Sequence, residues 1–164
     1  MSRARAFLII SILSAAAMPL ARAAPGTTCV VSSLSSLAFA YDPSLVAPTD
    51  SSASMTIQCN RNGGPANITM TISAGASAMS GSISPRQMRG IISGNLMSYD
   101  LYRDAGRSQV FGQTAGVDTL SVSVSGIPNN GSKTVPINLW GRIPALQAVG
   151  VGSYTDSVVI TVAP

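Results

Sequence analysis

The stretch Asn67-Ile68-Thr69-Met70-Thr71-Ile72-Ser73-Ala74 alternates strictly between apolar and small polar residues. Successive side chains of a β-strand point to opposite faces, so this pattern sets one apolar row against a core and one polar row toward solvent. The same period of two recurs at residues 55–60 and 119–125. The sequence therefore predicts a protein of β-strands, each with one buried face.

Turn-forming residues separate these strands. Clusters of Asn, Gly and Pro occupy residues 60–65 and 126–131, and no stretch after residue 23 sustains an apolar period of 3.6 residues. Further strands are predicted near residues 28–40, 96–103, 133–143 and 152–162. About seven short strands with turns between them predict an antiparallel β-sandwich.

Residues 74–95 fit this pattern less well. They are rich in Gly, Ser and Ala and carry two arginines, Arg86 and Arg89. We expect a long loop here, with room for one helical turn. Loops of this length are usually functional or mobile.

The first 23 residues have the features of a secretory signal peptide. Arg3 and Arg5 form a positive region, an apolar run follows over 7–17, and Ala21-Arg22-Ala23 is a small-x-small cleavage site. The apolar run is shorter than the about 20 residues that span a bilayer, and no later stretch is longer. We therefore expect a signal peptide over 1–23, one exported domain over 24–164 and no membrane span.

Charge and composition exclude several classes of function. Cleavage after Ala23 removes three of the ten basic residues and leaves seven basic residues against six acidic ones. This near-neutral balance does not provide the excess of positive charge that binds nucleic acid. The sequence contains no His and no Glu, so neither a Ser-His-Asp unit nor a common zinc site can form. We expect a protein that is not an enzyme, with no catalytic or metal-binding residues and no cofactor.

The two cysteines, Cys29 and Cys59, are an even number in an exported protein. The 29 residues between them do not resemble a Cys-x-x-Cys redox pair. We therefore predict a structural disulfide between Cys29 and Cys59.

Four methionines recur every nine residues. A cluster of methionine sulfurs can bind Cu(I), but an odd spacing alternates their faces along strands and no His or third Cys supports them. Met fills irregular gaps in cores, so we assign them to packing. The four residues are Met70, Met79, Met88 and Met97.

Strand parity separates inward from outward residues in the last two predicted strands. With Val135, Ile137 and Leu139 inward, Trp140 and Arg142 face outward, where an aromatic side chain is suited to a partner or, with Tyr102, a sugar. Asp156 shares the inward parity of Val158 and Ile160, so it needs a partner inside the protein. Arg142 is one candidate counter-ion.

Several motifs in this order resemble the spore coat protein U domain family, which includes subunits of archaic chaperone–usher pili. They lie along the whole exported domain and comprise Cys29, Phe39-Ala40-Tyr41-Asp42-Pro43, Ile57-Gln58-Cys59-Asn60, Arg86-Gln87-Met88, Leu96-Met97-Ser98-Tyr99-Asp100-Leu101-Tyr102, Gly141-Arg142-Ile143-Pro144-Ala145 and Gly152-Ser153-Tyr154-Thr155-Asp156.

The resemblance implies an immunoglobulin-like sandwich that lacks its final strand. In such subunits a periplasmic chaperone first fills the resulting groove, and a neighbouring subunit then replaces it after delivery to an outer-membrane usher. The last predicted strand has one apolar face suited to this edge, comprising Tyr154, Val158, Ile160 and Val162. The resemblance implies a secreted structural subunit of a pilus or coat that passes through the periplasm to the cell surface.

The N-terminal extension departs from the polymerising subunits of this family, which carry a long alternating apolar donor segment before their first cysteine. Cleavage after Ala23 leaves five residues before Cys29, which span at most about 17 Å. We therefore expect a subunit that accepts a donor strand without offering one, at a chain end. A carbohydrate-binding adhesin at a fibre tip is the alternative function.

Overall fold

The computed structural model describes residues 26–163, and this part of the chain contains strands but no helix. The predicted signal peptide lies outside the described residues. The strands are β1 (Thr27–Leu34), β2 (Thr49–Arg61), β3 (Ile68–Ala74), β4 (Arg86–Gly90), β5 (Leu96–Tyr102), β6 (Leu120–Val124), β7 (Gly131–Ile143), β8 (Tyr154–Thr155) and β9 (Ile160–Ala163).

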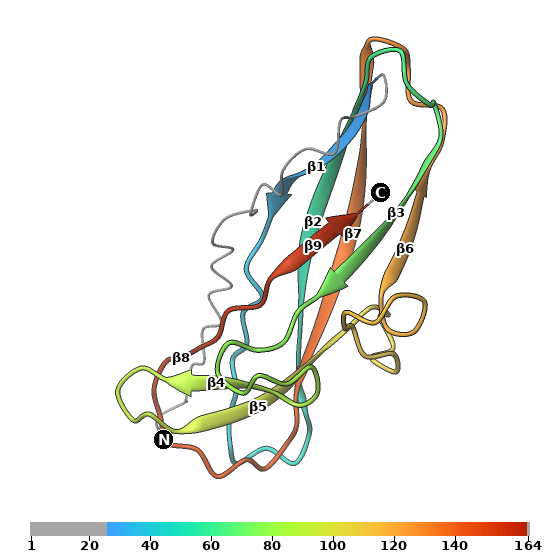
Figure 1. The fold of residues 1–164 in the computed structure, drawn as a ribbon. Helices are drawn as coiled ribbons and strands as arrows, with labels where there is room; N and C mark the ends of the chain where they lie inside the picture. Colours follow the sequence, from blue (N-terminus) through green and yellow to red (C-terminus); the bar gives the residue numbers. More distant parts are fainter. Residues whose placement is uncertain (1–25, 164) are drawn as a thin grey trace.

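The strands form two antiparallel sheets with a shared core. A six-stranded sheet has the order β1-β2-β7-β5-β4-β8, and a three-stranded sheet has the order β6-β3-β9. Figure 1 shows β2 and β7 running along the molecule, with β4 and β5 crossing at the end where β8 lies. The predicted all-β, immunoglobulin-like sandwich is confirmed.

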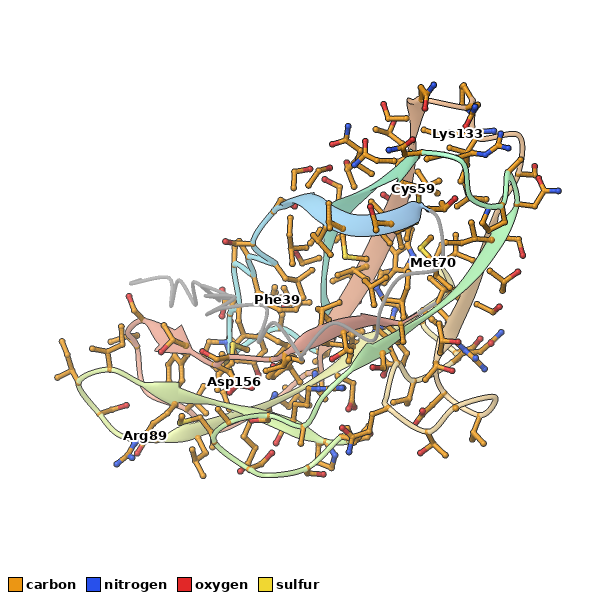
Figure 2. All side chains as sticks on the ribbon, turned by 45° about the horizontal axis from the view of Figure 1, so that its top comes forward. Phe39, Cys59, Met70, Arg89, Lys133 and Asp156 are labelled. Atoms are coloured by element: carbon orange, nitrogen blue, oxygen red, sulfur yellow. A yellow bond between two sulfur atoms is a disulfide. The ribbon has the colours of Figure 1, made fainter. Side chains whose placement is uncertain are left out.

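The long pair β2–β7 is the backbone of the six-stranded sheet. It runs in unbroken register from Thr49 opposite Ile143 to Arg61 opposite Gly131. The outward row of β2 is mostly Ser, Thr and Gln, and its inward residues Ala53, Met55, Ile57 and Cys59 are buried. Figure 2 shows Cys59 and Met70 between the two sheets, while Arg89 and Lys133 point away from them.

Gly141 allows the segment after β1 to pack directly on the backbone of β7. A Cβ atom at this position would lie 2.3 Å from Leu37 Cδ2 and 2.7 Å from Phe39 Cζ. Leu37 and Phe39 are both buried, so any larger residue at 141 would displace part of the core.

The prediction of a loop over 74–95 is wrong in one respect, because it contains β4. Arg86, Met88 and Gly90 of β4 are buried, and Met88 lies directly opposite Met97 of β5. The strand was missed because its inward row begins with a charged residue, which conceals the apolar alternation. The prediction of core methionines holds for Met70, Met88 and Met97, whereas Met79 is exposed.

The predicted terminal strand over 152–162 is divided between the two sheets. β8 pairs with β4 in the six-stranded sheet, and β9 pairs with β3 in the three-stranded sheet. Residues 156–159 cross between them. Figure 1 shows the segment passing from one end of the sandwich to its middle.

The predicted disulfide joins Cys29 of β1 to Cys59 of β2. The two residues lie directly opposite each other in the β1–β2 pair. The bridge therefore ties the edge strand β1 to the long strand β2 beside it.

We expect replacement of both cysteines by Ala to lower the free energy of unfolding by about 3–4 kcal/mol, because the bridge restricts the unfolded chain. Urea unfolding of the wild-type and doubly substituted chains measures the difference. Reductant should lower the unfolding midpoint of the wild type and leave that of the variant unchanged. Equal stability of the two oxidised proteins would contradict this role.

Candidate functional site

The outer edge of the terminal segment is the candidate functional site. Along its inner side the segment makes backbone contacts throughout: β8 pairs with β4, the carbonyls of Ser157 and Val159 accept from Ala78 and Gly75, and β9 pairs with β3. Along its other side no strand of the described residues 26–163 is paired with it. One continuous edge therefore runs past both sheets.

The backbone groups on this edge can be assigned from their neighbours. The Val159 carbonyl faces Gly75, whereas the Ala74 N–H donates to Gly112 O and so points away from β9. Backbone groups of successive residues in a strand point to opposite sides. The N–H and C=O groups of Ile160 and Val162 therefore face away from β3, toward the unpaired edge.

The side chains of the same residues are incompletely covered. Tyr154 and Val158 are buried, but Ile160 and Val162 are only half-buried although they pack against the core. Cys29 and Leu34 of β1 are half-buried in the same way. Of the four residues that the sequence singled out for this edge, Ile160 and Val162 thus combine unpaired backbone with partly covered apolar side chains.

β9 also lacks the features by which natural proteins protect sheet edges. Edge strands are usually blunted by charges, prolines or bulges. β1 has an irregularity between Val31 and Ser33, but β9 reads Ile-Thr-Val-Ala and pairs with β3 in regular register. β9 is therefore well suited to pair with another strand.

Asp156 anchors the crossing between β8 and β9. It is 3% exposed, and the Tyr99 hydroxyl donates to its Oδ2 at 2.7 Å. Burial and this hydrogen bond to a carboxylate raise the pKa of Tyr99, so the phenol stays protonated. The predicted alternative of Arg142 as counter-ion is wrong, because Arg142 lies on the outer face of the sheet and binds Asp50.

Arg86 holds the end of β3 that receives the terminal segment. Its guanidinium is fully buried and donates to four carbonyls, those of Ala74, Gly75, Ile83 and Phe111, at 2.6–3.3 Å. Burial lowers the pKa of Arg86, and nearby Tyr99 and three Asp carboxylates oppose that shift. Because Gly75 also donates to Val159, Arg86 supports the segment at the point where it crosses.

Trp140 and Arg142 lie together on the outer face of the six-stranded sheet, away from β9. Arg142 makes two hydrogen bonds to Asp50, at 2.7 and 2.9 Å, which lower the pKa of that carboxyl. Arg107 also contacts Asp50 at 3.3 Å, and its guanidinium lies 5.5 Å from the centre of the Trp140 ring. One face of the indole is thus covered by Arg107, and both arginines are held by one carboxylate.

Sequence reasoning missed the supporting role of Arg86 and of Tyr99. Parity could have indicated Tyr99, which alternates with outward residues beside the buried Met97, whereas the charge of Arg86 hides its inward place in β4. Among residues 26–163 there is no cluster of three acidic, Cys or His side chains that could hold a metal, and no helix long and apolar enough to cross a membrane.

The sequence of this chain is similar to known proteins of one family. The model of the Spore Coat Protein U domain matches residues 15–161. "Protein U" of Myxococcus xanthus is 35% identical over 77 residues, which cover 47% of this chain and 39% of that protein. The chain therefore spans well under half the length of this curated relative.

A solved structure shares the fold. It is the CsuC–CsuE chaperone–tip adhesion subunit pre-assembly complex from archaic chaperone–usher Csu pili of Acinetobacter baumannii, matched at a TM-score of 0.55 and 17% identity. The match covers 84% of this chain and 40% of that one. With the family match over most of its length, the chain belongs to the Spore Coat Protein U domain family.

Proposed function

We propose that this chain is a secreted structural subunit of a surface pilus or coat, assembled by donor-strand complementation. A periplasmic chaperone would first pair with β9, and another subunit would replace it at an outer-membrane usher. The observation that carries the proposal is the edge of β9. There the backbone groups of Ile160 and Val162 pair with no strand of the described residues, and their side chains are only half-buried. Strand addition satisfies both needs at once.

The family and the shared fold support the proposal that this chain is a subunit of a surface structure. The similar solved structure is a chaperone bound to a tip subunit of a pilus. The proposal includes a place at the end of a fibre, because the short segment before Cys29 is too short to serve as a donor strand. The alternative of a sugar-binding platform at Trp140 is less favoured, because Arg107 occupies one face of the ring.

Two substitutions in β9 test the acceptor edge. Ile160→Asp places a charge among the apolar side chains that a donor strand would cover, so we expect capture by the chaperone to be abolished. Thr161→Asp is the matched control, because Thr161 is exposed on the opposite face of the same strand. Co-purification of each variant with a tagged chaperone from the periplasm measures capture.

Capture of the Thr161→Asp chain at the wild-type level, together with loss for Ile160→Asp, supports the acceptor edge. Equal capture of both variants would show that the partner strand binds elsewhere. Filaments assembled from this chain alone would contradict a place at the chain end and leave the acceptor edge intact.

A further inference from the structure

A cavity of about 480 Å³, lined mainly by polar and charged residues, lies beside the three-stranded sheet, on the side away from the core. Its floor is formed where β3 and β6 pair, with Thr71 directly opposite Ser121. Its walls come from the segment 103–119, which connects β5 to β6. The lining residues are Thr71, Arg103, Asp104, Gln109, Gly116, Thr119, Leu120 and Ser121.

Two turns of this segment form the walls, and each is fixed by its own hydrogen bonds. In the first turn Asp104 accepts from the backbone of Ser108 and Gln109 at 2.8–3.2 Å, and the backbone N–H of Arg103 donates to Gln109 O. In the second turn the Asp118 carboxylate accepts from the backbone N–H of Thr114 at 2.6 Å. A cavity whose walls are fixed before binding loses little entropy when it binds a ligand.

Several polar groups in the cavity have no partner in the described chain. Arg103 donates through Nη1 to Thr119 O at 2.7 Å, and its Nη2 makes no hydrogen bond to residues 26–163. The Gln109 amide and the hydroxyls of Thr71 and Ser121 likewise make none within those residues. The cavity therefore offers a guanidinium donor, an amide that both donates and accepts, and two hydroxyls.

The two charges in the wall restrict the class of ligand. Desolvation raises the pKa of Asp104, but the hydrogen bonds from Gln109 and Ser108 together outweigh it and lower the pKa, so the carboxylate is ionised. An anion would be repelled by this carboxylate, and a cation would be repelled by Arg103. A neutral molecule with many hydroxyl groups avoids both conflicts and can pair with every free donor and acceptor.

We propose that this cavity binds a neutral saccharide. Its volume lies within the range of small-molecule sites, roughly 300–1,000 Å³. The site is on the outer side of the three-stranded sheet, so a strand added at the edge of β9 leaves it open. It is also separate from Trp140, so it does not depend on that surface.

Titration of the isotopically labelled secreted chain with neutral and charged sugars tests the proposal by nuclear magnetic resonance. The probes are triacetylchitotriose and maltotriose, with trigalacturonic acid and chitotriose as the anionic and cationic comparisons. We expect at least one neutral trisaccharide to shift the backbone signals of Thr71, Gln109, Thr119 and Ser121. The charged sugars should leave these signals unchanged.

Two exposed side chains of the cavity can be truncated without disturbing the core. Gln109→Ala and Ser121→Ala should each weaken binding about five- to tenfold, because each removes a hydrogen bond to the sugar. Gln113→Ala is the matched control, because Gln113 is an exposed amide in the same segment that does not line the cavity. It should bind as the wild type does.

Three results would overturn the proposal. They are no shift with either neutral sugar, shifts confined to residues outside the cavity, and equal binding by the Gln109→Ala, Ser121→Ala and Gln113→Ala chains. Preference for a charged sugar would reject the neutral class. None of these results depends on capture by a chaperone, so this proposal and the strand-acceptor function can fail separately.

Discussion

Fusing a donor strand to the C-terminus through a flexible Gly/Ser linker should raise the melting temperature of this chain by roughly 12–16 °C. The tether supplies a millimolar effective concentration of donor. A donor that binds with micromolar affinity is then present at about 1,000 times its dissociation constant, which stabilises the folded state by about 4 kcal/mol. For a domain of this size, 1 kcal/mol corresponds to roughly 3–4 °C.

The donor is an alternating Val/Thr peptide of about ten residues, which presents apolar side chains beside Ile160 and Val162 and main-chain groups to the edge of β9. The control carries the same residues and linker in an order without alternation. Differential scanning calorimetry measures both fusions beside the unfused chain. Identical melting temperatures for the alternating and shuffled fusions would mean that the described sandwich needs no further strand.

Arg86→Lys should be among the most destabilising single substitutions in this protein. A lysine ammonium cannot reach the four carbonyls that the guanidinium spans from β3 to Phe111. At least two buried carbonyls would lose their donors, each at a cost of about 1–3 kcal/mol. We expect the free energy of unfolding to fall by about 3–5 kcal/mol, a large part of the total for a domain.

Arg89→Lys is the matched control, because Arg89 is exposed three residues along in the same strand. It should change the free energy of unfolding by no more than about 0.5 kcal/mol. Urea unfolding and the yield of folded protein measure the effect of both substitutions. If Arg86→Lys proves as stable as Arg89→Lys, the carbonyls around Arg86 find other donors and the residue does not support the terminal segment.

The sequence predicted the fold wherever the apolar row is unbroken. The alternation in β3 and β6 survives because each inward position carries an aliphatic or Met side chain. It failed at β4, where the inward Arg86 donates to the remote carbonyls of Ala74 and Phe111 as well as to the nearby Ile83, and no local pattern reveals the remote ones. From the sequence alone, a buried arginine in a strand cannot be distinguished from an exposed arginine in a loop.

The sequence singled out the residues of the candidate site but did not predict how they are arranged. Alternation continues through residues 154–162, so the pattern cannot show that the chain leaves one sheet after Thr155 and joins the other at Ile160. The partner of Asp156 was misjudged although parity already placed Arg142 outward. Only the fold shows that Tyr99, 57 residues earlier, reaches it.

The Cys29–Cys59 bridge has a consequence for which strands this domain can exchange. The six-stranded sheet ends at β1, so without the bridge an invading strand could displace β1 and take its place beside β2. The bridge retains β1 within a few ångströms of its own site, where it outcompetes any invader that arrives from dilute solution. The disulfide thus closes one route to swapped oligomers, and it leaves β9 as the edge where a further strand could pair without displacing one already present.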